Sequence, residues 1–284
     1  MGGPRPQSLR RARADLQVPT LAAAVAAIRE VGERITLGGL PAQLCPFVVG
    51  ISGYGNVSLG AQEVADALGA IAVAPADLDG LFAGPVARCA VHKVVFAEHD
   101  MVARRDATAP FELDEYLRHP ELYEGVFDRW LPRLTVLLNC VFWDTPYPRL
   151  VTKAAVRRLY AAASLLLRVI GDVSCDIEGS VELTSKETHI DDPVYVYDPE
   201  AGSIADGVAG RGPVVLAVGN LPCELSRESS LAFSAALSPF VPALAETDFS
   251  LPYAQLRLPP ELRRALILHH GDFTPGYEYM RQFI

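Results

Sequence analysis

Two glycines separated by one residue, Gly53 and Gly55, are the positions most able to do chemistry in this chain. They follow an apolar run, Phe47–Ile51, that predicts a buried strand, and a helical pattern comes after them. In a dinucleotide-binding turn, the first glycine permits a tight bend and the second lets backbone N–H groups approach a pyrophosphate at the helix N-terminus. Ser58 takes the third place of the G-x-G-x-x-G pattern, so the match is partial. The sequence therefore predicts a phosphate turn here, with a purely structural turn as the alternative.

Polar side chains also occur at the ends of other apolar runs. Asn139 interrupts the run 134–143, and Asp172 lies near the end of the run 167–174. Ligands of parallel sheets sit beyond the carboxyl ends of the strands, so these two side chains are candidates for a site. His99, between Glu98 and Asp100 after the run 93–96, could tune a proton transfer. The alternatives are structural: Asn139 can pair with a neighbouring loop, Asp172 can cap a helix, and His99 can be a surface residue between two acids.

Apolar strands and helical segments alternate along the chain. Helical spacing is seen over 20–34, 61–68 and 153–167, and a second strand is expected at 70–73. This alternation predicts an α/β fold, a Rossmann-like parallel sheet with helices on both faces. The pattern changes after Glu178, and a long helix bent at Pro239 and Pro242 is expected over 228–246. We expect a disordered lead-in over 1–19, a dinucleotide-binding domain over 20–180, and a C-terminal α/β segment of a second, incomplete domain over 181–284.

Composition narrows the classes of partner. The chain has 284 residues and a net charge of −9, which argues against binding to nucleic acid. Five widely spaced cysteines without a C-x-x-C pair indicate neither a disulfide framework nor a zinc site, so no metal is expected. No apolar run reaches the length of about 20 residues needed to cross a membrane. We expect a cytoplasmic protein.

Four stretches of this sequence resemble a known family. In residues and order they are similar to the lysine–2-oxoglutarate reductases, which form saccharopine, and to the lysine-forming saccharopine dehydrogenases, both related to the alanine dehydrogenases. The similarity runs from about residue 24 to the C-terminus. The stretches are Gly53 to Glu63, Leu138 to Trp143 with Pro148 to Leu150, Asp172 to Asp176 with Gly179 and Ser180, and Asn220 to Pro222 followed by Glu228.

The resemblance implies an oxidoreductase that uses NADP or NAD, with lysine, 2-oxoglutarate and saccharopine as small-molecule substrates. It places cofactor contacts at Gly53, Tyr54, Gly55, Asn56, Asp172, Val173, Ser174 and Cys175, and substrate contacts at Asn139, Cys140 and Val141. The family's acid–base lysine and histidine fall in an N-terminal part that this sequence does not match, so no catalytic residue is assigned. That part is expected either from a longer form of this chain or from a partner chain, and a homo-oligomer is a further option.

The choice of cofactor is predicted from one position. A dinucleotide fold that prefers NAD carries an acidic residue after its second strand, to bind the ribose hydroxyls. Here that place is near Ala74 and Pro75, with Asp77 and Asp79 slightly later, so NADPH is favoured. Two alternatives stay open: a non-catalytic nucleotide-binding subunit, and a dehydrogenase for another amino acid such as alanine.

Overall fold

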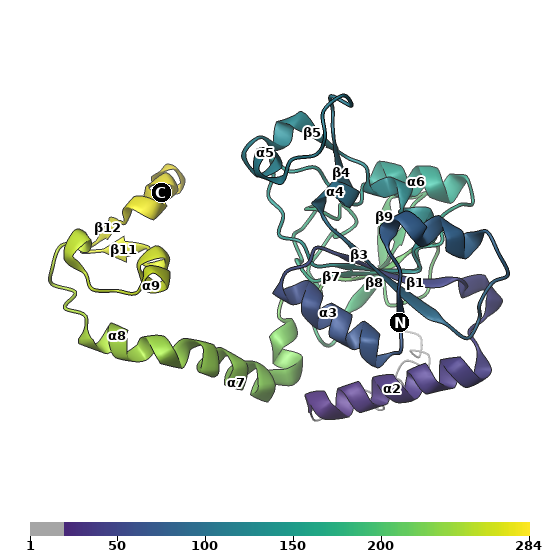
Figure 1. The fold of residues 1–284 in the computed structure, drawn as a ribbon, viewed down its shortest axis with the longest axis horizontal. Coiled ribbons are helices and arrows are strands. Elements are labelled where there is room, and N and C mark those ends of the chain that lie inside the picture. The colour runs from purple at the N-terminus through teal and green to yellow at the C-terminus, as the bar shows by residue number, and fades with distance from the viewer. Residues whose placement is uncertain (1–19) are drawn as a thin grey trace, which may run out of the picture. The chain divides into compact units, whose positions relative to one another are not determined.

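A computed structural model describes residues 20–284, and the expected lead-in over 1–19 lies outside the described residues. Its main feature is an eight-stranded sheet with the order β2-β3-β1-β6-β7-β10-β8-β9 (Figure 1). The strands from β2 to β10 in this order run parallel, and β8 and β9 are antiparallel to their neighbours. The α/β fold with a mostly parallel sheet is therefore confirmed. The strands are β1 (Phe47–Ser52), β2 (Ile71–Ala72), β3 (Val91–Phe96), β6 (Val136–Asn139), β7 (Val169–Asp172), β8 (Val194–Asp198), β9 (Ser203–Asp206) and β10 (Val214–Leu216).

The strand beside β1 differs from the expected one. β3 pairs with β1 along its full length, from Phe47 opposite Val91 to Ser52 opposite Phe96. The run expected to neighbour β1 forms only the two-residue β2, which pairs with the outer side of β3. Both residues of β2 are exposed, so this run lies at the sheet edge rather than in its centre. The ribose-binding position of a dinucleotide fold must therefore be sought after β3.

Helices cover both faces of this sheet. The helices of this unit are α2 (Leu21–Gly38), α3 (Asn56–Ala67), α4 (Glu98–Met101), α5 (Leu113–Arg118) and α6 (Lys153–Ala161). The Thr20 hydroxyl accepts a hydrogen bond from the Ala23 N–H at 3.2 Å and caps α2. A Cβ at Gly32 within this helix would lie 2.3 Å from the Leu68 carbonyl oxygen, so this glycine allows α2 to pack closely against the end of α3. A separate two-stranded antiparallel sheet is formed by β4 (Val102–Arg104) and β5 (Tyr123–Gly125), with α5 in the connection between them.

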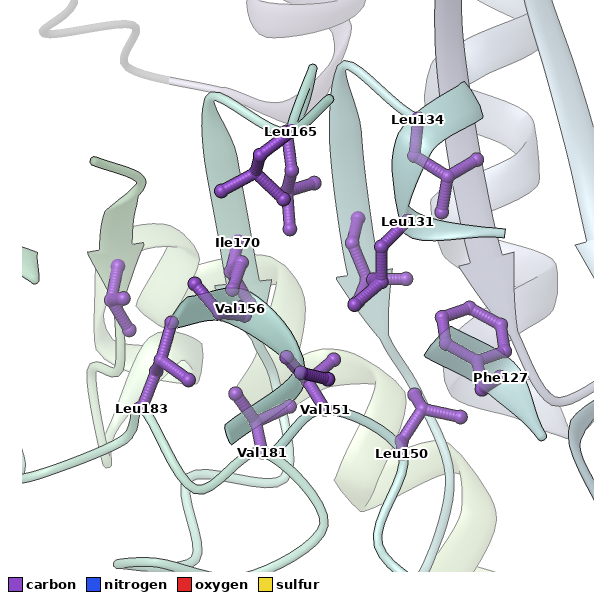
Figure 2. Close-up of a cluster of buried hydrophobic side chains, with 14 of the residues drawn as sticks. Phe127, Leu131, Leu134, Leu150, Val151, Val156, Leu165, Ile170, Val181 and Leu183 are labelled. Carbon is purple, nitrogen blue, oxygen red and sulfur yellow. The ribbon is translucent and has the colours of Figure 1, made fainter. Parts of the chain in front are cut away.

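Alternating side chains of the central strands build two apolar layers. Val48 and Leu137 belong to the larger cluster, together with Val156 of α6. Val49 lies in the second cluster, with Ala65 of α3. Figure 2 shows side chains of the larger cluster, among them Leu131, Leu134, Val151, Val156 and Ile170. Burial of both faces fixes the register of β1 and hence the place of the glycine turn that follows it.

Residues 225–284 form a second compact unit. The expected bent helix is present as α7 (Ser226–Leu237) and α8 (Val241–Glu246), joined by a 3₁₀ turn over Ser238–Phe240. The unit also contains α9 (Pro260–Ala265), β11 (Leu268–His269) and β12 (Asp272–Phe273). The boundary between the two units thus lies after Glu224, later than the expected boundary at 180. The reason is that β10 pairs with β7, so β8, β9 and β10 belong to the main sheet of the first unit. No helix within residues 20–284 has the length and apolar character to cross a membrane.

Candidate functional site

The turn after β1 needs glycine at its first position. Gly53 has φ +83°, a conformation that strains any residue with a side chain. Its N–H donates to the Phe96 carbonyl oxygen at 2.9 Å, which ties the turn to the end of β3. A Cβ at Gly53 would lie 3.2 Å from Val141 Cγ1 and 3.3 Å from the Cys140 carbonyl oxygen. Gly53 therefore serves the fold by letting the chain turn closely over the end of β6.

Gly55 has a different environment. It is the N-cap of the twelve-residue helix α3, and no side chain caps this helix. The first turn of α3 contains no acidic residue, and a Cβ at Gly55 would meet nothing within 4 Å. The first N–H groups of a helix lack partners within it and carry the positive end of its dipole. The open N-terminus of α3 therefore fits the pyrophosphate of a dinucleotide, on residues Gly55 to Ser58.

A cavity of about 510 Å³ opens beside this helix terminus. Its wall combines the glycine turn with the segments that follow β3 and β6 and with α5. Of the predicted site residues, Gly53, Tyr54, Gly55, Asn56, Cys140 and Val141 line it. The wall also contains residues that the sequence did not single out as contacts, namely Val57, Glu98, Met101, Val102, Tyr116, Leu117, Phe142, Trp143, Tyr147, Pro148, Arg149, Leu150 and Ser180.

Behind the cavity lies a buried polar network at the ends of β1, β6 and β7. Asn139 and Ser52 are fully buried and Asp172 is 1% exposed. The Asn139 amide nitrogen donates to Asp172 Oδ1 and to Ser180 Oγ, both at 2.8 Å. The Asn139 amide oxygen accepts from Ser52 Oγ at 3.0 Å. The amide is thus satisfied within the protein and holds the three strand ends in register.

Asp172 is held from both sides of its carboxyl group. Asn139 donates to one oxygen, and Thr184 donates to the other at 2.5 Å. Burial raises the pKa of Asp172 above its ordinary value, and the hydrogen bonds from Thr184 and Asn139 oppose that shift. The side chain does not reach the cavity, so its direct effect is on the strand end that it supports.

The other predicted residues after β7 also lie behind the cavity. Ser174 donates to the Val141 carbonyl oxygen at 2.8 Å, and the Cys175 thiol donates to the Ala217 carbonyl oxygen at 3.0 Å. Val173 donates its N–H to the Asn139 carbonyl oxygen at 3.1 Å. The predicted residues thus fall into two groups. One group lines the cavity wall: Gly53, Tyr54, Gly55, Asn56, Cys140 and Val141. The other forms a supporting layer behind the wall: Asn139, Asp172, Val173, Ser174 and Cys175.

Neither cysteine of these segments is suited to nucleophilic chemistry. Burial raises the pKa of Cys140 to about 11, and burial together with nearby carboxylates raises that of Cys175 to the same value. The thiolate is the reactive form, and at neutral pH it is scarce for such a group. Cys140 therefore acts in the wall by its shape and backbone.

The cation on the wall is Arg149, which was noted in the sequence only as part of a resembling stretch. Its guanidinium lies 5.4 Å from the centre of the Trp143 ring. Its Nε donates to the carbonyl oxygens of Glu178 and Gly179, and the side chain pairs with Glu182 at 3.5 Å. These contacts fix the Trp143–Arg149 pair at the cavity, where its positive charge favours an anionic group of a ligand.

This chain is similar to several known proteins. Residues 136–275 match the family described as alanine dehydrogenase/PNT, C-terminal domain. The alpha-aminoadipic semialdehyde synthase of Arabidopsis thaliana is 37% identical over 273 residues, which cover 92% of this chain and 25% of that protein. The mitochondrial alpha-aminoadipic semialdehyde synthase of Bos taurus is 30% identical over 91% of this chain and 29% of its own length. The chain thus spans a quarter to a third of these relatives.

Two further matches are more limited. A saccharopine dehydrogenase [NAD(+), L-lysine-forming] of Schizosaccharomyces pombe is 31% identical over 117 residues, 40% of this chain and 28% of that protein. A solved L-alanine dehydrogenase superposes on 91% of this chain and 61% of its own, with a TM-score of 0.46 and 17% identity. The sequence matches confirm the resemblance: the chain is similar to alpha-aminoadipic semialdehyde synthases over most of its length and to a saccharopine dehydrogenase over 117 residues.

Proposed function

We propose that this chain binds a nicotinamide dinucleotide and takes part in the reductive condensation of lysine with 2-oxoglutarate to saccharopine, or in its reverse. The observation that carries the proposal is the uncapped N-terminus of α3, with Gly55 open to a cavity of about 510 Å³. Similarity to alpha-aminoadipic semialdehyde synthases over nine-tenths of the chain supports the choice of substrates.

The residues of the wall have separate tasks in this proposal. The N–H groups at the start of α3 hold the pyrophosphate, and Gly53 sets their position. The cofactor supplies the hydride when it is bound, and the protein orients the imine carbon towards it. Arg149 beside Trp143 is placed to attract a substrate carboxylate, and Cys140 and Val141 contribute the backbone at the end of β6. The supporting layer positions the ends of β6 and β7 behind the wall; it consists of Asn139, Asp172, Val173, Ser174 and Cys175.

Proton transfer calls for groups beyond this wall. Among the described residues that line the cavity there is no lysine or histidine, and the carboxyl and phenol groups are Glu98, Tyr54, Tyr116 and Tyr147. Burial raises the pKa of Tyr116 to about 12, so its phenol is a poor base at neutral pH. We therefore propose that a partner chain or a further domain supplies the acid and base.

We also propose that the protein is cytoplasmic and associates with itself. Cell fractionation tests the location, and light scattering tests the self-association.

The same observation favours a second candidate function. A chain that binds the nucleotide but does not transfer protons to a substrate works as a nucleotide-binding subunit, which responds to the ratio of reduced to oxidised cofactor without turning over substrate. This candidate predicts binding of NADH or NADPH and no oxidation under any combination of amino acid and oxo acid.

The deciding experiment is a titration of the whole chain with NADH and NADPH, followed by the nicotinamide absorbance after addition of lysine and 2-oxoglutarate. Trp143 lines the cavity, so quenching of tryptophan fluorescence reports binding. Oxidation that needs both substrates supports the reductase, and a pyruvate and ammonia pair tests the alanine alternative. Binding without oxidation favours the subunit. Absence of binding by either nucleotide refutes the dinucleotide site at Gly53 and Gly55.

The preference between the two nucleotides depends on the strand order. The sequence favoured NADPH because no acidic residue directly follows the run at 70–73. That run is now the edge strand β2, and β3 occupies the place beside β1. The residues after β3 therefore decide which nucleotide fits.

A further inference from the structure

We propose that the thiols of Cys45 and Cys89 form a reversible disulfide, with a low-molecular-weight disulfide such as oxidised glutathione as the oxidant. Cys45 lies just before β1 and Cys89 just before β3, at the end of the sheet opposite the cavity. The wide spacing of the cysteines along the chain hides this pair, which depends on the pairing of β3 with β1. The proposal is independent of the nucleotide site.

The register of the two strands places the cysteines opposite each other. Phe47 is paired with Val91 at the start of the β1–β3 ladder, and the same register carried back along both chains pairs Cys45 with Cys89. Neighbouring strands lie about 4.8 Å apart, within the Cα separation of about 4.4–6.8 Å that a disulfide needs. Side chains alternate between the faces of a sheet, so the two cysteines point to the same face as Phe47 and Val91, which pack in the cluster on the α3 side.

The segments that carry the two cysteines stay tied together before the strands begin. The Leu40 N–H donates to the Arg88 carbonyl oxygen at 2.8 Å, and Arg88 Nε donates to the Leu40 carbonyl oxygen at 2.7 Å. Arg88 directly precedes Cys89 in the chain. This reciprocal pair therefore holds Cys89 beside the segment that leads into Cys45.

Both sulfur atoms lie against the same short stretch of that segment. A Cβ on Gly39 would lie 3.5 Å from Cys89 Sγ. The Cys45 thiol donates to the Pro41 carbonyl oxygen at 3.4 Å. The two thiols thus meet the chain two residues apart, which agrees with their opposite positions in the extended register.

The surroundings of the thiols set the order of their reactions. Cys89 is exposed and Cys45 is half-buried, so Cys89 meets the oxidant first. Burial raises the pKa of the Cys45 thiol, the charge of Arg88 opposes that rise, and the charge of Cys89 adds to it. Charges in physiological salt act over about 8 Å, so this influence of one thiol on the other agrees with their proximity.

The reaction is a pair of thiol–disulfide exchanges. The Cys89 thiolate attacks one sulfur of oxidised glutathione, which forms a mixed disulfide and releases one glutathione thiolate. The Cys45 thiolate then attacks the Cys89 sulfur, which forms the internal disulfide and releases the second glutathione thiolate. In total the two protein thiols lose two protons and two electrons, and oxidised glutathione becomes two molecules of reduced glutathione.

The new bond closes a loop that contains β1, the glycine turn, α3 and β2. A cross-link stabilises a protein mainly by restricting its unfolded chain. Oxidation should therefore stabilise the part of the sheet that carries the glycine turn, while the bond itself stays at the other end of the strands.

The test treats wild type, Cys45→Ser and Cys89→Ser with oxidised glutathione, blocks the remaining thiols by alkylation and digests each protein with trypsin. Trypsin cleaves after Arg88, so the two cysteines fall in separate peptides and a disulfide between them appears as a linked pair in mass spectrometry. Cys223→Ser is the matched control, because Cys223 is an exposed thiol of the other side of the sequence. Melting of the reduced proteins checks that each variant is folded.

Wild type and Cys223→Ser should give the linked Cys45–Cys89 peptides, in at least about tenfold excess over the glutathione adduct of Cys89, because the second thiol is held in place rather than supplied from solution. Neither of the other two variants should give them, and dithiothreitol should remove them. The melting midpoint of oxidised wild type should rise above that of the reduced protein.

An adduct of Cys89 that persists without the linked peptides would refute the pair, and so would linkage chiefly to another cysteine. An unchanged or lower melting midpoint of the linked protein would show that the bond distorts the fold, and would overturn the assignment of these positions as a native site. The wild-type peptides decide the matter even if a serine variant fails to fold.

Discussion

Replacing each glycine of the turn by alanine separates the two tasks that the structure assigns to them. At Gly53 the φ of +83° places alanine in the left-handed region, which costs about 1–2 kcal/mol. The new Cβ would also press against Val141 and Cys140 at 3.2 and 3.3 Å, which raises the expected loss to about 2–3 kcal/mol. We expect Gly53→Ala to lower the free energy of unfolding by that amount.

At Gly55 the same substitution should leave stability almost unchanged. Its φ of −75° suits alanine, and the Cβ would meet nothing within 4 Å. The reduced entropy of the unfolded chain contributes about 0.4–1 kcal/mol of stability. The poorer N-cap costs a similar amount, so the net change should stay within about 0.5 kcal/mol. Binding should nevertheless weaken about tenfold or more, because the methyl group occupies the space through which the pyrophosphate approaches the backbone.

Urea unfolding and a titration with NADH measure the two effects side by side. Gly60→Ala is the control, since Gly60 lies on the exposed side of α3 with no atom within 4 Å of its Cβ position. It should gain about 0.5–1 kcal/mol and bind NADH as wild type does. Unaltered NADH binding by Gly55→Ala would refute the assignment of the α3 terminus as the phosphate site. Unaltered unfolding of Gly53→Ala would refute the argument from its backbone.

Further predictions concern the layer behind the wall and the core. Because burial raises the pKa of Asp172, protonation stabilises the fold, so wild type should gain stability relative to Asp172→Asn as pH falls from 7 towards 4, by at most about 1.4 kcal/mol per pH unit in urea unfolding. A thiol reagent at pH 7 should label the exposed Cys89 much faster than Cys140, as mass spectrometry of timed samples would show. Replacement of the fully buried Leu137 by alanine should lower the free energy of unfolding by about 2–5 kcal/mol in urea unfolding, more than the same replacement of an exposed leucine.

Local pattern was sufficient to predict most elements of the first unit. The strand before the glycine turn was expected over 47–51 and spans Phe47–Ser52, since apolar residues run without break into a glycine. The helix expected over 61–68 begins earlier, at Asn56, because Gly55 itself is its N-cap. The prolines at 239 and 242 divide the C-terminal helix where expected.

Pairing between distant strands could not be predicted in the same way. The run at 70–73 and the run that became β3 are both apolar, and nothing local says which lies beside β1. For this reason the acid at Glu98 was treated as part of a surface group, although its strand neighbours the glycine turn. Asn139 and Asp172 were rightly placed at strand ends, but their mutual hydrogen bond depends on the order of β6 and β7.

The matched donors and acceptors around Asn139 also have a kinetic consequence. Ser52, Asp172 and Ser180 already satisfy this amide, so the floor of the cavity has one geometry that does not wait for a ligand to complete it. Ordering of side chains and loops is a large part of the free-energy cost of association. The side chains around Asn139 are already ordered in the folded protein, so binding does not have to order them. Nucleotide entry at this edge should therefore be a single fast phase whose rate rises linearly with nucleotide concentration, and selectivity between nucleotides should reside in how slowly each one leaves.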